Sequence, residues 1–241
     1  MESSIPIAAA GQQNLQKQLI VIANNMANAN TVGFKAEVVD FKHLISRSAS
    51  EDVHFPNVAK LYPSMQQGGL EQTDNPLDIA LTGEGWFAIA TPAGTAYTRD
   101  GRFTMSEFGE LRTLEGHGVL DAGGAPIQLN PNAPPPEILQ DGRIFSNSRQ
   151  VGNIGVFLSP PENFESRYSN SAFLASTPGI PTPVGGNIKI EQGFVEQSNV
   201  SALTELASLI TISKNYQAVT SMISRVDQTL SKSVTDLSGQ G

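Results

Sequence analysis

The sequence contains no cysteine. That absence excludes disulfides, thiolate metal sites and a cysteine nucleophile. Charged residues are also scarce, at 16 % of the chain, which predicts large uncharged surfaces suited to packing against other subunits. The formal net charge is −8, and lysine and arginine form no basic run. An acidic chain of this kind is not expected to bind a nucleic-acid backbone.

Targeting and membrane signals are missing as well. The N-terminal stretch lacks the basic region and the long apolar core of a secretory signal peptide. No apolar run approaches the roughly 20 residues of a membrane span. We therefore expect no direct membrane insertion, and export, if it occurs, by a route that needs no cleaved signal.

No catalytic or metal-binding pattern emerges from the residues. His43, His54 and His117 are not at ligand spacing with one another or with a pair of carboxylates. Strings of the type G-x-S-x-G, Walker A or H-E-x-x-H are absent. The Asp74-Asn75-Pro76 sequence favours a turn over a calcium or catalytic site. We therefore expect a protein that is not an enzyme, with no catalytic residues, cofactor or metal.

The segment from Asn199 to Leu237 carries the longest periodic pattern. Its apolar residues recur at alternating steps of three and four, which is a heptad a/d seam. The seam consists of Leu209, Ile212, Tyr216, Val219, Ile223, Val226 and Leu230. A short second stripe, Leu203, Leu206 and Ile210, widens the apolar face, and Asn199 is the expected N-cap. The pattern predicts a long helix that needs a partner helix along its length.

A matching stripe lies at the other end of the chain. Leu15, Leu19, Ile22 and Met26 are spaced four, three and four residues apart, and the pattern stops between Asn28 and Gly33. We expect the two terminal helices to pair as antiparallel helices and, together, to form an assembly interface. The alternative is a pair of ordinary core helices, because short heptad patterns also arise by chance.

The sequence pattern in the middle of the chain is typical of β structure. Apolar residues alternate from Leu77 onward, turn signals recur about every 8–12 residues, and Asp100-Gly101 favours a two-residue hairpin. The predicted fold class is α+β, with paired long N- and C-terminal helices, coiled-coil-like, and an inserted all-β domain. The expected parts are a helical segment 1–34, an extended and mostly irregular connector 35–75, a β domain 76–197 and a helical segment 198–241.

Three blocks of the sequence resemble the flagellar basal-body rod and hook protein family. They are IANNMANANTVGFK (residues 22–35), NPLDIALTGEGWFAI followed by AYTRDGRFTM (residues 75–89 and 96–105), and IEQGFVEQSNVSALTELASLITISKNYQ (residues 190–217). The blocks stand in the family's order and, with their flanks, cover most of the chain. Where family members often carry Arg-Ala-Tyr-Glu, this chain has Lys214-Asn215-Tyr216-Gln217, which keeps the tyrosine and changes the flanking charges.

The resemblance implies a structural subunit of the bacterial flagellar rod. Such a protein is exported through the flagellar type III apparatus and assembles in the periplasm with copies of itself and with neighbouring rod proteins. Its terminal helices form an axial tube, and its β domain forms an outer layer. The compact length, Trp86 and the plain stop after the last helix favour a proximal-rod member, with a distal-rod or hook-type member as the alternative.

An interpretation from a different class is a soluble β-rich binding or glycan-processing module with a helical stalk. It requires a cleft with convergent acids or aromatic side chains. The chain has one Trp and 7 % aromatic residues, which gives little support for a surface on which sugar rings stack. A module of this type keeps its activity without residues 1–30 and 200–241, whereas a rod subunit loses its function.

Overall fold

The computed structural model describes residues 4–48, 51–160 and 163–238. The chain forms two compact units. We name Met1–Ala27, Glu37–Leu61 and Ser201–Gly241 the helical unit, and Asn28–Ala36 with Tyr62–Val200 the β unit. Each unit is therefore assembled from segments that lie far apart in the sequence.

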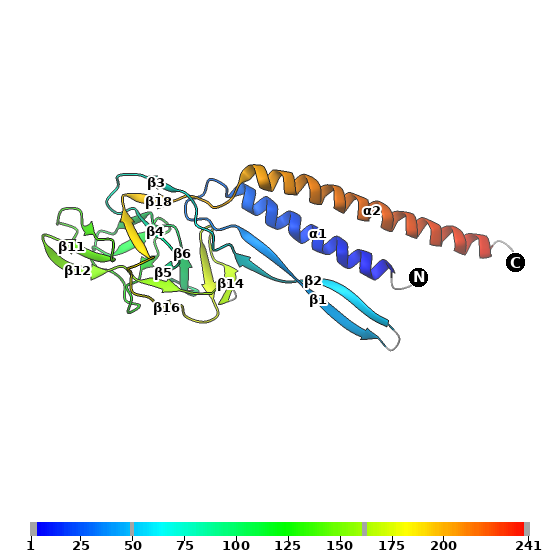
Figure 1. Ribbon diagram of the computed structural model, residues 1–241, viewed down its shortest axis with the longest axis horizontal. Coiled ribbons are helices and arrows are strands. Elements are labelled where there is room, and N and C mark those ends of the chain that lie inside the picture. Colours follow the sequence, from blue (N-terminus) through cyan, green and yellow to red (C-terminus); the bar gives the residue numbers. More distant parts are fainter. Residues whose placement is uncertain (1–3, 49–50, 161–162, 239–241) are drawn as a thin grey trace. The chain divides into compact units, whose positions relative to one another are not determined.

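The helical unit contains both ends of the chain. Its elements are α1 (Ser4–Ala27), β1 (Glu37–Ser48), β2 (Glu51–Pro63, which continues past the unit) and α2 (Ala202–Ser238). α1 and α2 lie side by side and run in opposite directions (Figure 1). Gln12 Nε2 donates a hydrogen bond to Thr220 Oγ1 at 3.0 Å, which fixes the register of the two helices. β1 and β2 form a two-stranded sheet, and β1 also contacts α1.

The predicted fold class is wrong in its helical part. In the described chain more residues lie in strands than in helices, and the two α-helices, of unequal length, lie near its two ends. α1 has 24 residues and α2 has 37, so at 1.5 Å per residue they span about 36 and 56 Å. The shorter helix cannot fill a seam that runs the length of the longer one. Residues 35–75, expected as an irregular connector, hold β1, β2 and β3 (Leu70–Gln72).

The start of α2 differs from the predicted cap. The helix begins after Ser201, whose Oγ accepts a hydrogen bond from the Thr204 amide at 3.4 Å, as an N-cap does. Asn199, the predicted cap, instead accepts a hydrogen bond from the Ala36 amide at 2.8 Å. The asparagine is therefore used to join two segments of the β unit.

Asparagines near the end of α1 also have specific partners. Asn25 Oδ1 accepts from the Glu37 amide at 2.9 Å, and Asn25 Nδ2 donates to the Glu37 carbonyl at 3.1 Å. The Asn25 side chain thus bonds both the N–H and the C=O of Glu37, as a neighbouring strand would, and it links the helix to the first residue of β1. The asparagine-rich sequence thus fixes where the chain goes after the helix ends at Ala27.

The β unit holds the remaining strands. They are β3, β4 (Ile79–Thr82), β5 (Trp86–Thr91), β6 (Gly94–Thr98), β7 (Phe103–Met105), β8 (Leu111–Thr113), β9 (Gly118–Val119), β10 (Glu137–Ile138), β11 (Arg143–Ser146), β12 (Arg149–Asn153), β13 (Val156–Leu158), β14 (Phe164–Arg167), β15 (Ala172–Ala175), β16 (Ile180–Pro181), β17 (Lys189–Gln192) and β18 (Phe194–Glu196). The largest sheet has the order β14-β15-β6-β5-β9-β8-β7, with β13 bound to β5 and β16. Smaller sheets pair β10-β11-β12, β17 with β4, and β18 with β3.

Strand β5 is buried on both faces. Trp86 and Ala88 belong to one apolar cluster, and Phe87 and Ile89 belong to the other. Successive side chains of a strand point to opposite faces, so a continuous apolar run is what this position requires. Trp86 packs edge-on against Phe164, with ring centroids 5.0 Å apart.

The hairpin predicted at Asp100-Gly101 does not form. β6 pairs with β5 and β15, while β7 pairs with β8. Asp100 Oδ1 instead accepts from the Arg102 amide at 3.1 Å, which makes a local side-chain turn. Gly101 is required because a Cβ there would clash with the Ile79 carbonyl oxygen. The predicted two-residue hairpin is therefore wrong, because the two flanking strands pair with other strands.

Candidate functional site

Three charged side chains meet inside the β unit. Lys35 Nζ lies 2.6 Å from Glu196 Oε1, and Arg99 Nη1 lies 3.0 Å from Glu196 Oε2. All three residues are at most 2 % exposed. We call Lys35, Arg99 and Glu196 the junction triad, because Glu196 ends β18, Arg99 follows β6, and Lys35 lies in the short segment between α1 and β1.

The carboxylate of Glu196 has partners on both oxygens. Besides Lys35, Oε1 accepts a hydrogen bond from the Gly68 amide at 2.9 Å. The Glu196 carbonyl accepts from the Gly33 amide at 2.7 Å. Both cations use further acceptors, since Lys35 Nζ donates to the Gln66 carbonyl at 2.7 Å. A buried carboxylate is tolerated only when its charge and lone pairs are satisfied in this way.

Arg99 reaches the triad from the end of β6. Its Nη2 donates to the Gly83 carbonyl at 2.6 Å, and its guanidinium lies 5.7 Å from the Trp86 ring centroid. Burial lowers the pKa of Arg99 and the pKa of Lys35 from their ordinary values, and the negative charge of Glu196 opposes that effect at both groups. The ion pairs therefore offset part of the penalty of burying two cations.

A second arginine holds the Gly33–Lys35 turn in place. The Arg167 guanidinium lies 4.3 Å from the Phe34 ring centroid and 4.4 Å from that of Phe173. Arg167 Nη2 also donates to the Lys35 carbonyl at 2.8 Å. Stacking between two aromatic rings together with a directed hydrogen bond uses the planar guanidinium in a way that lysine cannot reproduce.

Two glycines allow the close approach of backbones at the junction. Gly33 has φ +69°, and a Cβ there would overlap the backbone of Asp100. A Cβ at Gly68 would overlap the Gln197 carbonyl oxygen. Within the β unit, these contacts bring the segment after α1 and the segment before α2 against other backbone without an intervening side chain.

The residues predicted as an assembly interface fall on the two helices of the helical unit. Those with described side chains are half-buried rather than fully buried: Leu15, Leu19, Ile22 and Met26 on α1, and Leu209, Ile212, Tyr216, Val219, Ile223 and Val226 on α2. The side chain of Leu230 lies outside the described ones. Among the described side chains of α1, the buried ones are Asn14, Val21 and Asn25. The two predicted stripes lie on helices that contact each other, and their role in assembly stays a prediction.

The junction triad was missed at the sequence level. Lys35 and Glu196 are separated by 161 positions, and Arg99 and Glu196 by 97. No periodic pattern marks an ion pair between such distant residues. The only available signal was that each residue stands inside one of the three blocks that carried the family resemblance.

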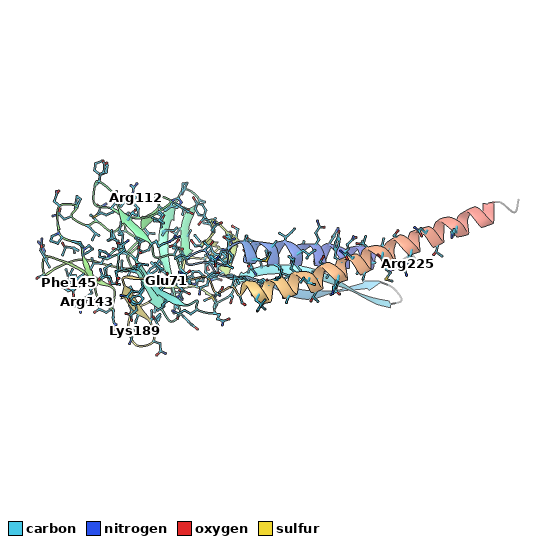
Figure 2. The ribbon with its side chains drawn as sticks, turned by 90° about the horizontal axis from the view of Figure 1, so that it is seen from above. Glu71, Arg112, Arg143, Phe145, Lys189 and Arg225 are labelled. Atoms are coloured by element: carbon cyan, nitrogen blue, oxygen red, sulfur yellow. The ribbon has the colours of Figure 1, made fainter. Side chains whose placement is uncertain are left out.

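Basic side chains on the surface of the β unit have acidic neighbours. Arg112 Nη2 lies 2.5 Å from Glu110 Oε2, and Arg143 Nε lies 2.7 Å from Asp141 Oδ2. Figure 2 shows Arg112, Arg143 and Lys189 at separate places on the unit. Two of these three cations are thus paired with acids, and all three lie apart from one another.

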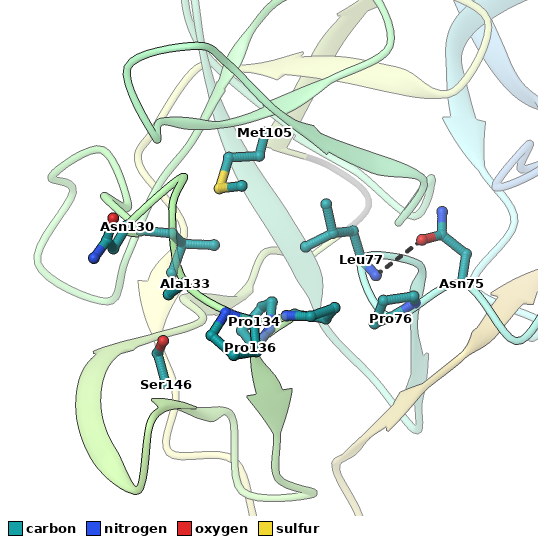
Figure 3. A pocket seen from close by; sticks show the side chains of 11 residues that line it. Asn75, Pro76, Leu77, Met105, Asn130, Ala133, Pro134, Pro136 and Ser146 are labelled. Atoms are coloured by element: carbon teal, nitrogen blue, oxygen red, sulfur yellow. Dashed lines mark hydrogen bonds between the residues drawn. The ribbon is translucent and has the colours of Figure 1, made fainter.

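One cavity in the β unit is lined mainly by apolar groups. Its volume is about 170 Å³, and Leu77, Met105 and the prolines of the 134–136 run line it together with Asn75 (Figure 3). No carboxylate or aromatic side chain lines it, so this cavity does not have the convergent acids or aromatic side chains that the binding-module interpretation requires. Among the described residues, no cluster of three potential metal ligands occurs and no helix is long and apolar enough to cross a membrane.

Family models match three regions of the chain. Residues 5–35 match "Flagella basal body rod protein", residues 80–146 match "Flagellar hook protein FlgE/F/G D1 domain", and residues 191–237 match "Flagellar basal body rod FlgEFG protein C-terminal". Each region supplies one member of the junction triad: Lys35, Arg99 and Glu196 respectively. The triad is therefore a point at which all three regions meet in space.

Relatives with curated names extend over nearly the whole chain. A flagellar basal-body rod protein FlgF of Mesorhizobium japonicum is 45 % identical over 90 % of both chains, and one of Rhizobium meliloti is 37 % identical over 99 % of both. A flagellar basal-body rod protein FlgG of Bacillus subtilis is 31 % identical over 97 % of this chain and 98 % of its own. The resemblance read from the sequence is confirmed, and the chain belongs to the flagellar basal-body rod protein family, with FlgF proteins among its relatives.

Proposed function

We propose that this chain is a structural subunit of the bacterial flagellar basal-body rod, in its proximal part, and that it has no enzymatic activity. The observation that carries the proposal is the junction triad, which locks one residue from each of the three family regions into a single buried contact. An arrangement that holds backbone segments from distant parts of the chain together supports a structural role.

The helices at the chain ends are the proposed assembly elements. Residues 1–34 and 198–241 would act as rod segments, residues 35–75 as the connector and residues 76–197 as the β domain. The half-buried stripe residues of α1 and α2, including Ile22 and Ile223, leave apolar surface that one copy does not cover. Neighbouring subunits can bury such surface in a lattice.

The proposed partners are other copies of this chain and the neighbouring rod proteins. The chain would reach the periplasm through the flagellar type III export apparatus and assemble there into the axial drive shaft. Nucleic acid and direct insertion into a membrane are not part of this function. The charge of −8 and the paired surface cations support that part of the proposal.

Deletion of the gene followed by complementation tests the proposal. A strain without the chain should not swim, and its purified basal bodies should stop before the distal rod. Complementation with an epitope-tagged chain should restore swimming and place the tag in purified basal bodies. A strain that swims normally without the chain would contradict the proposal.

A distal-rod role is the second candidate, favoured by the 31 % identity to a FlgG protein over 97 % of this chain. The position of the tag separates the two roles. A proximal subunit is present in basal bodies that lack the distal rod, whereas a distal subunit is absent from them.

A further inference from the structure

Three large apolar side chains on α2 are left uncovered. Leu203 is 79 % exposed, Leu206 is 44 % exposed and Ile210 is 49 % exposed. Their spacing of three and four residues places them on one face of the helix. In the sequence this stripe widens the apolar face of the predicted helix, and in the structure its three side chains are exposed.

A face of different character is left uncovered on α1. Ile20 is 62 % exposed, and Ala23 and Ala27 follow it at exposed positions on the same face. On this face only the isoleucine side chain projects far from the helix, because the two alanine side chains are small. Large side chains of another helix can approach such a surface closely, because small residues let the helix backbones come together.

The two faces lie at the same level of the helical unit. The hydrogen bond between Gln12 and Thr220 sets the register of α1 and α2. Counting from that bond at 1.5 Å per residue, Ala23 is about 16 Å along α1 and Ile210 is about 15 Å along α2 in the same direction. A neighbouring copy at nearly the same height can therefore set one face against the other.

We infer that the Leu203–Leu206–Ile210 stripe of α2 packs on the Ile20–Ala23–Ala27 face of α1 in a second copy of the chain. This inference rests on the proposed function and names the surfaces that the assembly uses. The contact is heterologous, since one copy contributes α2 and the other contributes α1. A heterologous contact leaves both outer faces free for the next copies, so it can repeat along a tube.

A second copy is the occupant because both halves of the contact are present on one chain. Lys17 is the only charged residue of α1, so the face presents almost no charge to reject an apolar partner. Three side chains on each side cannot bury the roughly 1,200 Å² that a stable pair in solution needs. The contact should therefore form only where other contacts hold the copies in a lattice, and the purified chain should be a monomer.

Disulfide trapping tests the contact directly, because the natural sequence contains no cysteine. The double variant Ala23→Cys/Ile210→Cys is expressed as the only copy of the chain, and purified basal bodies are oxidised and run on a non-reducing gel. A disulfide requires Cα atoms within about 7 Å. We expect dimers and higher species, which disappear on reduction, because each copy links to the next.

Two sets of controls locate the contact. The single variants Ala23→Cys and Ile210→Cys should each give only monomer, because a heterologous contact never places identical residues together. The double variant Ala23→Cys/Gln217→Cys moves the second cysteine about 10 Å along the same face of α2 and should give less than a tenth of the cross-linked product. Dimers from a single variant, or equal product from the displaced pair, would overturn the inference.

The same basal-body samples separate this inference from the proposed function. If the double variant is present in basal bodies and supports swimming but gives no cross-linked species, the inference is wrong and the proposed function stands. If the natural chain itself is absent from basal bodies, the proposed function fails. A variant chain that is absent from basal bodies is replaced by Ala27→Cys/Leu206→Cys, whose residues are also level, and the same outcomes decide.

Discussion

The ammonium group of Lys35 lies 2.6 Å from the carboxylate of Glu196, although 161 positions separate the two residues in the chain. Lys35 follows the turn after α1, and Glu196 ends the last strand before α2. The contact joins, inside the β unit, the segment that comes from one terminal helix to the segment that leads to the other. Arg99 completes it from the end of β6.

Glu196→Gln should destabilise the folded chain strongly. The substitution leaves Lys35 and Arg99 buried without a counter-charge, and breaking a buried ion pair from one side costs about 3–5 kcal/mol. Urea unfolding of the purified chain, followed by tryptophan fluorescence of Trp86, measures the change. The exposed Glu165→Gln is the matched control and should shift the free energy of unfolding by less than about 0.5 kcal/mol. Equal midpoints for the two variants would show that the triad contributes little.

The stability difference between the natural chain and Lys35→Met should depend on pH. Burial lowers the pKa of Lys35 below its ordinary value of 10.5. In the interval between the lowered pKa and 10.5 the unfolded chain therefore binds more protons than the folded one. Stability rises with pH wherever the unfolded state binds more protons. The free energy of unfolding of the natural chain should therefore increase relative to that of Lys35→Met as the pH approaches 10.5. Unfolding midpoints between pH 7 and 10 measure this, and a difference that falls over that range would contradict the assignment.

Gly33→Ala should cost more than strain in the backbone alone explains. Gly33 has φ +69°, and an added Cβ meets the backbone of Asp100, which cannot move aside. Gly186, with φ +61° and no atom near an added Cβ, provides the matched control. Gly186→Ala should cost about 1–2 kcal/mol from the left-handed conformation, and Gly33→Ala should exceed it clearly in the same unfolding experiment. Similar losses would mean that the Gly33 turn shifts freely.

Trp86→Ala should act through the folding of the β unit. Trp86 is 1 % exposed and packs edge-on against Phe164 and Phe173. Truncating a buried aromatic side chain costs about 3–5 kcal/mol, a large share of the stability of an ordinary domain. Thermal unfolding of the purified variant, with Trp86→Phe as the milder control, measures the loss. A Trp86→Ala chain with natural stability and normal cellular abundance would contradict this account of the core.

Local patterns predicted the elements better than their connections. The heptad stripes identified helices at both ends because a helix with one buried face repeats every three to four residues. The same patterns did not identify Asn14 and Asn25 as buried residues of α1, since an asparagine signals a turn unless its distant hydrogen-bond partner is known. Asn25 is satisfied by the backbone of Glu37, which lies in a segment that the sequence suggested to be irregular.

The junction triad shows the same limit more sharply. Each of its charges, read alone, predicts an exposed side chain. Only the fold reveals that Glu196 can satisfy Lys35 and Arg99 together. The resemblance to a family indicated which blocks matter, but gave no information on which of their residues touch. Contacts between distant residues leave no trace in periodicity, and these were the contacts that define the site.

The proposed rod function depends most directly on the apolar seam of α2 being buried between subunits. Ile223, half-buried near the middle of that seam, is replaced in the chromosome by aspartate, and the chain is quantified in cell extracts and in purified basal bodies alongside a swarming assay. An unpaired carboxylate in a buried contact costs several kcal/mol, and the loss repeats in every copy. We expect the Ile223→Asp chain to be made and exported, to be absent from basal bodies and to abolish swarming, while the natural chain is present. Normal incorporation and normal swarming by the Ile223→Asp strain would contradict the account.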